Sequence, residues 1–260
     1  MSDDTLLFEL RGRTAWLTLN RPDAMNALTL DMYERLAEHC EAIEAGGDIR
    51  CMVIAGAGER AFAAGTDINV FRQVRDEAAV LAYEALMDRV FGAIERCPVP
   101  VIAAMAGAAT GGGAAIACAA DIRIATADLR FGFPIARTLG NALSIANLSR
   151  LCALVGEGRA RDMLLTSELM NAESALAAGL VSRLCPDREA LIAEAQRLAG
   201  QIETLSPVTL AATKDALLRL RMEGSGAQDR DLILRAYMSE DFREAVEAFF
   251  EKRRPAFKGR

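Results

Sequence analysis

Residues 99–125 read VPVIAAMAGAATGGGAAIACAADIRIA, and this stretch decides the fold class. The apolar run at 99–105 predicts a buried strand, and a glycine-rich turn follows at 107–113. Residues 113–120 predict a helix that is apolar on nearly every face, and 121–125 predict another strand. Strand, turn, buried helix and strand in this order favour an α/β fold with parallel pairing.

The same alternation extends toward the N-terminus. We expect a β-hairpin at 6–19, a helix at 28–44, a strand at 51–55 and a second long helix at 76–96. Beyond about residue 157 the pattern turns helical, with helices predicted at 157–165, 172–178, 187–203, 206–222 and 228–251. We therefore expect a core over 1–200 and a C-terminal helical region over 201–260.

The composition excludes several functional classes. Of the 260 residues 52% are apolar and 25% are charged, which is typical of a globular protein rather than a disordered one. The net charge is −6 and the basic residues are dispersed, so nucleic acid is not an expected partner. No apolar run reaches the roughly 18–20 residues that span a bilayer, so we expect no membrane partner.

The histidine and cysteine content limits the chemistry further. His39 is the single histidine, which excludes multi-histidine metal sites, and its position at the edge of an apolar helical stripe is typical of a helix flank. Six cysteines are scattered without a CxxC pair, and the N-terminus is acidic. We therefore expect reduced thiols, a cytoplasmic location and no metal site.

Two loops of small residues are the candidates for chemistry. Residues 61–67 (AFAAGTD) and 107–113 (GAATGGG) each follow a predicted strand, and the second opens onto a helix. Unobstructed backbone amides at a helix N-terminus can hold a phosphate or a developing oxyanion. Dinucleotide and Walker-type spacings are absent. Close helix packing is the alternative explanation for the glycines.

Several ordered motifs together resemble the crotonase (enoyl-CoA hydratase/isomerase) superfamily over essentially the whole chain. They are NRP at 20–22 with NAL at 26–28, RAFAAGTDI at 60–68, PVIAAMAG at 100–107 running into Gly111-Gly112-Gly113, DIRIA at 121–125, FGFP at 131–134, ALAAGLV at 175–181 and AFFEKRRPAFK at 248–258. The resemblance implies a crotonase-like spiral of ββα units with a C-terminal helical trimerisation region. It also implies an acyl-CoA substrate, and a homo-trimer or a hexamer built as a dimer of trimers.

The resemblance assigns the oxyanion hole to backbone amides. These are the N–H groups of Thr66 and Gly112, which would stabilise an enolate-like charge on the thioester oxygen. Ala64, Thr66 and Ile68 would contact coenzyme A, which enters as part of the substrate rather than as a tightly bound cofactor. No side chain is required for the oxyanion role, which fits the small residues around both positions.

The resemblance at 248–253 also implies that the C-terminal helix reaches the nucleotide end of coenzyme A, commonly on a neighbouring subunit. Phe249 could supply an aromatic wall for adenine, and Lys252, placed one helical turn away on the same face, could meet the 3′-phosphate. The alternative is that the phenylalanines merely pack and that the basic end complements the helix dipole.

The sequence departs from the family where hydratases carry two glutamates. Ala115 and Ile135 stand at those positions, and neither side chain can transfer a proton. The following loop offers Arg137, Asn141, Ser144 and Asn147 as substrate-facing candidates, although turn formation and helix capping would also explain them.

Three acidic residues near the loops have structural alternatives. Asp67 follows the first oxyanion donor and could simply cap the next helix. Glu84 and Asp88 lie one turn apart on a helix that in some family members lends an acid to the pocket, and a solvated helix face is their alternative.

The sequence is compatible with three functions. The first is an acyl-CoA lyase or isomerase that works through a stabilised enolate without the hydratase glutamates. The second is a non-catalytic acyl-CoA-binding homologue. The third is a serine hydrolase on a related spiral fold, which would have to recruit His39 from the opening helix.

Overall fold

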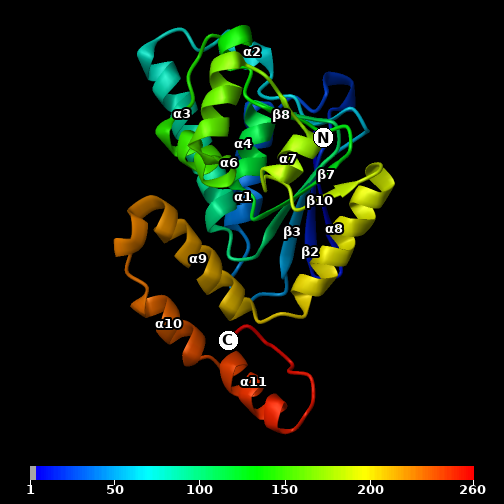
Figure 1. Ribbon diagram of the computed structural model, residues 1–260, viewed down its shortest axis with the longest axis vertical. Coiled ribbons are helices and arrows are strands. Elements are labelled where there is room, and N and C mark those ends of the chain that lie inside the picture. The colour runs from blue at the N-terminus through cyan, green and yellow to red at the C-terminus, as the bar shows by residue number, and fades with distance from the viewer. Residues whose placement is uncertain (1–3) are drawn as a thin grey trace.

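The computed structural model describes residues 4–260, and its core is a six-stranded sheet (Figure 1). In sheet order its strands are β1 (Leu6–Arg11), β2 (Thr14–Leu19), β3 (Cys51–Gly56), β5 (Val101–Met105), β7 (Ile122–Thr126) and β10 (Arg183–Cys185). β1 and β2 form the predicted antiparallel hairpin, and every other pairing in the sheet is parallel. The predicted α/β class is confirmed.

A second sheet of short strands lies where the sequence predicts loops. Its order is β4 (Ala61–Ala63), β6 (Ala108–Thr110), β8 (Arg130–Gly132) and β9 (Met170–Asn171). Strands this short, built of alanine and glycine, carry no readable alternation. They pair because β3 and β5 already run parallel and deliver the next segments side by side, with Ala61 opposite Ala108.

Helices cover both faces of the six-stranded sheet (Figure 1). On one face α8 (Arg188–Glu203) buries an apolar cluster that includes Trp16, Val53 and Ile102. The main core lies on the other face, under α1 (Leu30–Glu41), α3 (Glu77–Arg96), α4 (Gly112–Ala119) and α6 (Ile145–Thr166). The central strands are buried on both sides, which explains their continuous apolar runs.

Two helix predictions are wrong in extent. The helix expected at 157–165 is the C-terminal part of α6, which begins at Ile145 and is interrupted where Gly156 adopts φ +78°. The helix expected at 228–251 is two helices, α10 (Arg230–Tyr237) and α11 (Glu240–Phe250). Ser239 separates them because its hydroxyl accepts from the Phe242 amide and caps α11.

The remaining elements are short or belong to the C-terminal region. They are α2 (Ile68–Phe71), α5 (Ile135–Thr138), α7 (Ala172–Ala177), α9 (Pro207–Glu223) and 3-10 turns at Pro22–Ala24 and Gly224–Gly226. Between residues 4 and 260, no helix combines the length and apolar character needed to cross a membrane.

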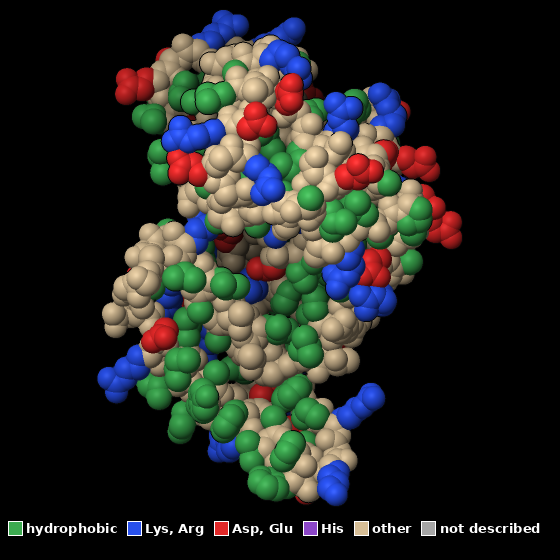
Figure 2. All heavy atoms as spheres, viewed as in Figure 1, with side chains coloured by type: hydrophobic (Ala, Val, Ile, Leu, Met, Phe, Trp, Pro, Cys, Tyr) green, Lys and Arg blue, Asp and Glu red, His purple; other side chains and the backbone are tan. Residues whose placement is uncertain are grey.

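The C-terminal helices α9 to α11 extend away from the sheets and carry exposed apolar side chains. Figure 2 shows these side chains gathered over the lower part of the molecule. Met222, Met238, Phe249 and Phe250 are each more than 70% exposed. An apolar surface of this extent is typical of an interaction face.

Candidate active site

A cavity of about 340 Å³ lies where the two small-residue loops meet α3 and the segment 133–147. Its walls are mainly apolar, with Phe71, Met87, Phe91 and Phe133 among them. Both predicted oxyanion residues, Thr66 and Gly112, line this cavity. The structure therefore brings together two loops that are 46 residues apart in the sequence.

Backbone pairing leaves the Thr66 amide free to face a ligand. Leu28 pairs with this loop, its amide donating to the Gly65 carbonyl at 2.8 Å and its carbonyl accepting from the Asp67 amide at 2.9 Å. The intervening Thr66 amide has no acceptor within residues 4–260. Gly65 turns the chain here at φ +107°, a conformation that favours glycine.

The Gly112 amide is free for a different reason. Gly112 is the first residue of α4, and the first-turn amides of a helix have no intrahelical acceptor. The helix dipole adds partial positive charge at this end. A developing oxyanion placed between this amide and that of Thr66 would be stabilised by both.

Close packing of a buried tyrosine explains why position 112 is glycine. A Cβ built on Gly112 would overlap the hydroxyl of Tyr33 and would lie 3.4 Å from Thr66 Oγ1. Tyr33 comes from α1 and is fully buried. Its hydroxyl lies 3.0 Å from Thr66 Oγ1, which in turn lies 3.0 Å from the hydroxyl of Tyr83 on α3.

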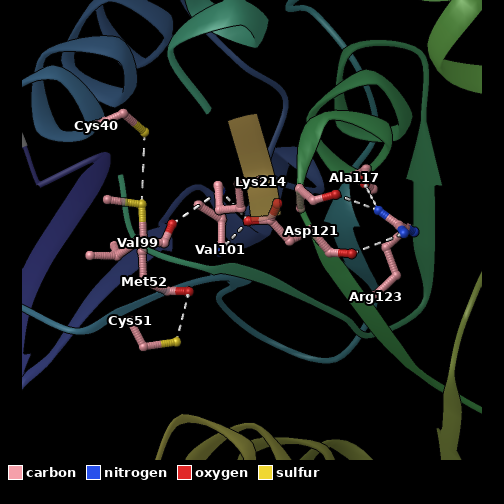
Figure 3. A network of polar contacts seen from close by, with 10 residues as sticks. Cys40, Cys51, Met52, Val99, Val101, Ala117, Asp121, Arg123 and Lys214 are labelled. Carbon is pink, nitrogen blue, oxygen red and sulfur yellow. Dashed lines mark hydrogen bonds and ion pairs between the residues drawn. The ribbon is translucent and has the colours of Figure 1, made fainter. Parts of the chain in front are cut away.

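The opposite end of α4 is held by a buried arginine (Figure 3). Arg123 donates to the carbonyls of Ala117 and Ala120, at 3.1 and 2.5 Å, and to that of Leu180 at 2.8 Å. A cation at the C-terminal end of a helix complements its dipole and satisfies its last carbonyls. Arg123 therefore fixes the helix whose first residue is Gly112.

A second cation, whose side chain is largely buried, attaches the C-terminal region to the same sheet (Figure 3). Lys214 of α9 forms an ion pair with Asp121 and donates to the Val99 carbonyl at 3.1 Å. Asp121 also accepts from the Val101 amide at 2.7 Å. Despite this pairing, burial raises the pKa of Asp121.

Both positions at which the resemblance leads us to expect glutamates in a hydratase lie in the cavity wall. Ala115 stands one turn after Gly112 on α4, and Ile135 begins α5. Among the cavity-lining residues that the structure describes, Glu84 is the one carboxylate. Burial, and secondarily the charge of Asp88, raises the pKa of Glu84. Asp88 itself is exposed and lies outside the lining.

Three of the four polar candidates in the loop after Ile135 lie at the cavity. Asn141, Ser144 and Asn147 line the cavity, whereas Arg137 is exposed and outside it. The Ser144 hydroxyl accepts from the Asn147 amide at 3.3 Å and caps α6, and the Asn147 side chain accepts from Arg150 at 3.0 Å. Asn141 has no hydrogen bond to any described residue, so its amide is available to a ligand.

Asp67 is a structural residue. Its carboxylate accepts from the Asn69 amide at 3.0 Å, capping α2, and pairs with Arg21 at 2.9 Å. The Asn69 amide foremost, and Arg21 next, lower the pKa of this carboxyl. Asp67 does not line the cavity, so the helix-capping interpretation is confirmed.

The residues expected to contact coenzyme A lie in two separate places. Ala64, Thr66 and Ile68 line the cavity, whereas Phe249 lies on α11 and is 79% exposed. The expectation that Lys252 shares a helical face with Phe249 is wrong, because α11 ends at Phe250. Lys252 adopts φ +56° as the left-handed residue of a Schellman cap, and the next amide, that of Arg253, donates to the Ala248 carbonyl at 3.0 Å.

His39 takes no part in the cavity. It stacks on Phe8 with ring centroids 4.7 Å apart, and burial lowers its pKa. This agrees with the helix-flank interpretation, and the described residues that line the cavity include no histidine. The serine hydrolase alternative therefore loses its required residue.

Sequence reasoning missed Tyr33, Tyr83 and Arg123. The two tyrosines occur in ordinary helical patterns, and nothing near them in the sequence points to Thr66. Arg123 falls inside a predicted buried strand, and an unpaired cation at such a position is the one local signal that could have drawn attention to it.

Known proteins resemble this chain along its full length. A family model described as enoyl-CoA hydratase/isomerase matches residues 11–260. The short-chain-enoyl-CoA hydratase of Clostridium acetobutylicum is 33% identical over 264 residues, covering 100% of each chain. The crotonyl-CoA hydratase of Syntrophomonas wolfei is 32% identical over 260 residues, covering 99% of each chain. A crystal structure of an enoyl-CoA hydratase/carnithine racemase from Magnetospirillum magneticum aligns with a TM-score of 0.91 at 34% identity, covering 100% of this chain and 97% of that one.

Proposed function

This chain belongs to the enoyl-CoA hydratase/isomerase family of the crotonase superfamily, which acts on CoA thioesters, and from this premise we propose that it is an acyl-CoA lyase or isomerase. Its reaction would pass through an enolate whose oxygen accepts from the amides of Thr66 and Gly112. Efficient hydration is not part of the proposal, because Ala115 and Ile135 offer no carboxylate.

The observation that carries the proposal is the pair of free amides in an apolar cavity. An amide without a protein acceptor is ready to donate to a thioester oxygen, and its donation strengthens as negative charge develops there. In other enzymes one such donor is worth about 3–4 kcal/mol of barrier. Two donors at fixed positions would make the α-carbon of a bound thioester markedly more acidic.

Glu84 is the group that we assign to proton transfer. It is the one carboxylate among the described lining residues, and those residues include no lysine or arginine that could pair with it. Its raised pKa brings proton release closer to neutral pH, where a general acid or base works best. One carboxylate can remove a proton from one carbon of the acyl chain and return it to another, which suffices for isomerisation.

A non-catalytic acyl-CoA-binding protein is the second candidate. It would use the same two amides and the same apolar walls, and it would leave Glu84 without a chemical task. Turnover separates the two functions, whereas binding of acyl-CoA is common to both.

Assembly into trimers or hexamers is also part of the proposal. The exposed apolar side chains of α9 to α11 provide a face for self-association (Figure 2). In such an assembly Phe249 and Lys252 could reach the nucleotide of a coenzyme A bound to a neighbouring subunit. Lys252→Ala should then weaken acyl-CoA binding while an acyl-pantetheine fragment binds as before. The six free cysteines suit the reducing cytoplasm.

The deciding experiment is incubation with a panel of enoyl-, hydroxyacyl- and malonyl-type CoA thioesters, followed by mass spectrometry. We expect one class to be converted by the wild-type protein and left intact by Glu84→Gln. Glu77→Gln is the matched control, because it removes an exposed carboxylate near the start of the same helix that does not line the cavity. Binding without turnover of any thioester would favour the second candidate, and equal turnover by Glu84→Gln would remove Glu84 from the mechanism.

A further inference from the structure

Three hydroxyl groups form a row that ends at the cavity. Tyr33 Oη lies 3.0 Å from Thr66 Oγ1, and Thr66 Oγ1 lies 3.0 Å from Tyr83 Oη. Tyr33 is fully buried on α1, whereas Tyr83 is half-buried on α3 and lines the cavity. The Tyr83 ring is held against Phe71 of α2, with centroids 5.3 Å apart. The row therefore connects the protein interior to the ligand space.

The number of hydroxyl hydrogens in the row limits which residue can donate a hydrogen bond to a ligand in the cavity. Three hydroxyls carry three hydrogens, but the two contacts use only two of them. If the third remained on Tyr33, it would be buried without an acceptor, because Thr66 is the only hydrogen-bond partner of that hydroxyl within residues 4–260. A buried unsatisfied donor is costly, so Tyr33 donates to Thr66.

Cooperativity then decides between Thr66 and Tyr83. A hydroxyl that accepts a hydrogen bond becomes a better donor, so a chain of successive donations is favoured over two donations to one oxygen. In that chain Tyr33 donates to Thr66 and Thr66 donates to Tyr83. The remaining hydrogen lies on Tyr83, at the cavity wall. Burial raises the pKa of both tyrosines, so both stay protonated and able to donate at neutral pH.

We propose that Tyr83 donates its hydroxyl hydrogen to an uncharged oxygen on the acyl chain of the substrate, with Tyr33 and Thr66 as the residues that orient it. This inference rests on the proposed function, since it takes an acyl-CoA as the occupant of the cavity. It adds a specificity-determining residue and a substrate class, namely acyl groups that carry a keto or hydroxyl oxygen.

Two neighbours define that substrate class. Thr66 supplies the oxyanion amide and also contacts Tyr83, so the acceptor oxygen lies only a few atoms from the thioester carbonyl. Glu84 is adjacent to Tyr83 and also lines the cavity, and its negative charge disfavours an acyl chain that ends in a carboxylate. A site built to hydrogen-bond a substrate oxygen also discriminates strongly against the analogue that lacks it.

The test is calorimetric titration with acetoacetyl-CoA and butyryl-CoA, which differ by the keto oxygen. We expect the wild-type protein to prefer acetoacetyl-CoA. Tyr83→Phe should lose about tenfold in affinity for acetoacetyl-CoA, as for one hydrogen bond, and keep its affinity for butyryl-CoA. Thr66→Val should lower the preference for acetoacetyl-CoA over butyryl-CoA, whereas Thr66→Ser, which retains the hydroxyl, should retain that preference.

A double-mutant comparison separates orientation from packing. Tyr33→Phe should weaken acetoacetyl-CoA binding although Tyr33 cannot touch the ligand, and Tyr33→Phe combined with Tyr83→Phe should be no weaker than Tyr83→Phe alone. Additive losses, or equal losses for both thioesters, would overturn the proposed donor and leave the proposed function standing. If the folded wild-type protein bound neither thioester, the proposed function itself would fall.

Discussion

Replacing Gly112 by alanine is the most direct test of the proposed oxyanion hole. The added Cβ would overlap the Tyr33 hydroxyl, with Tyr33 Cζ only 3.2 Å away. Tyr33 cannot swing aside, because it is fully buried and its ring packs edge-on against Phe91 at a centroid distance of 6.3 Å. The start of α4 must therefore shift, and the Gly112 amide must shift with it.

Two costs follow from this displacement. Overpacking a buried site costs about 1–3 kcal/mol, or roughly 2–4 °C in Tm per kcal/mol for a protein of this size. Loss of one oxyanion donor costs about 10²–10³-fold in turnover, and a misplacement of about 1 Å has a similar effect. We therefore expect Gly112→Ala to be folded at room temperature, less stable, and at least about 10²-fold slower on its thioester substrate.

The assay combines thermal unfolding with initial rates and acyl-CoA titration. Gly200→Ala is the matched control, because a Cβ at Gly200 on α8 meets no atom within 4 Å, and it should be neutral or slightly stabilising. Adding Tyr33→Phe to Gly112→Ala removes the overlapping hydroxyl and should recover part of the lost stability. Wild-type rate and Tm in Gly112→Ala would refute the close approach of Tyr33 to this amide.

Three further predictions concern Glu84, the side chains at positions 115 and 135, and the arginine that holds the helix carrying Gly112. Because burial raises the pKa of Glu84, the folded protein binds the carboxyl proton more tightly than the unfolded chain does, and the stability of the fold decreases as pH rises past the pKa of the unfolded chain. The Tm gain of Glu84→Gln over wild type should therefore be larger at pH 7 than at pH 4, and an equal gain at both pH values would contradict the raised pKa. Crotonyl-CoA hydration by the wild-type protein should be slower than that of a two-glutamate hydratase by about 10²–10⁴-fold per absent carboxylate, and the double variant Ala115→Glu, Ile135→Glu should hydrate crotonyl-CoA faster than wild type. The rate is measured by loss of enoyl absorbance, and rapid hydration by the wild-type protein would show that another group activates water. Arg123→Met leaves three buried carbonyls without their donor, so the free energy of unfolding, measured by urea titration, should decrease by about 3 kcal/mol. A decrease below about 1 kcal/mol would mean that water replaces the guanidinium as the donor.

The sequence by itself determined the features that depend on neighbours within a few residues. The hairpin, the parallel strands β3, β5 and β7 and the helices α1, α3, α8 and α9 follow from short-range apolar periodicity, whereas the full extent of α6 does not. The glycine-rich loop at a helix start indicated backbone amides that a ligand can approach, and the resemblance to the crotonase superfamily assigned the two amides to Thr66 and Gly112. In the structure neither amide has an acceptor among the described residues. Asp67 as a helix cap belongs to the same group.

Only the tertiary structure decided the contacts between distant segments. The strands of the second sheet are too short to show a period and form because parallel partners hold them in register. Lys252 leaves the helical face that its spacing suggests because the chain closes a Schellman cap there. Tyr33, Thr66 and Tyr83 come from three separate elements, and Glu84 reaches the cavity because α3 packs beside both loops. Local patterns encode which face of an element is apolar, whereas the pairing of faces depends on how all of them pack together.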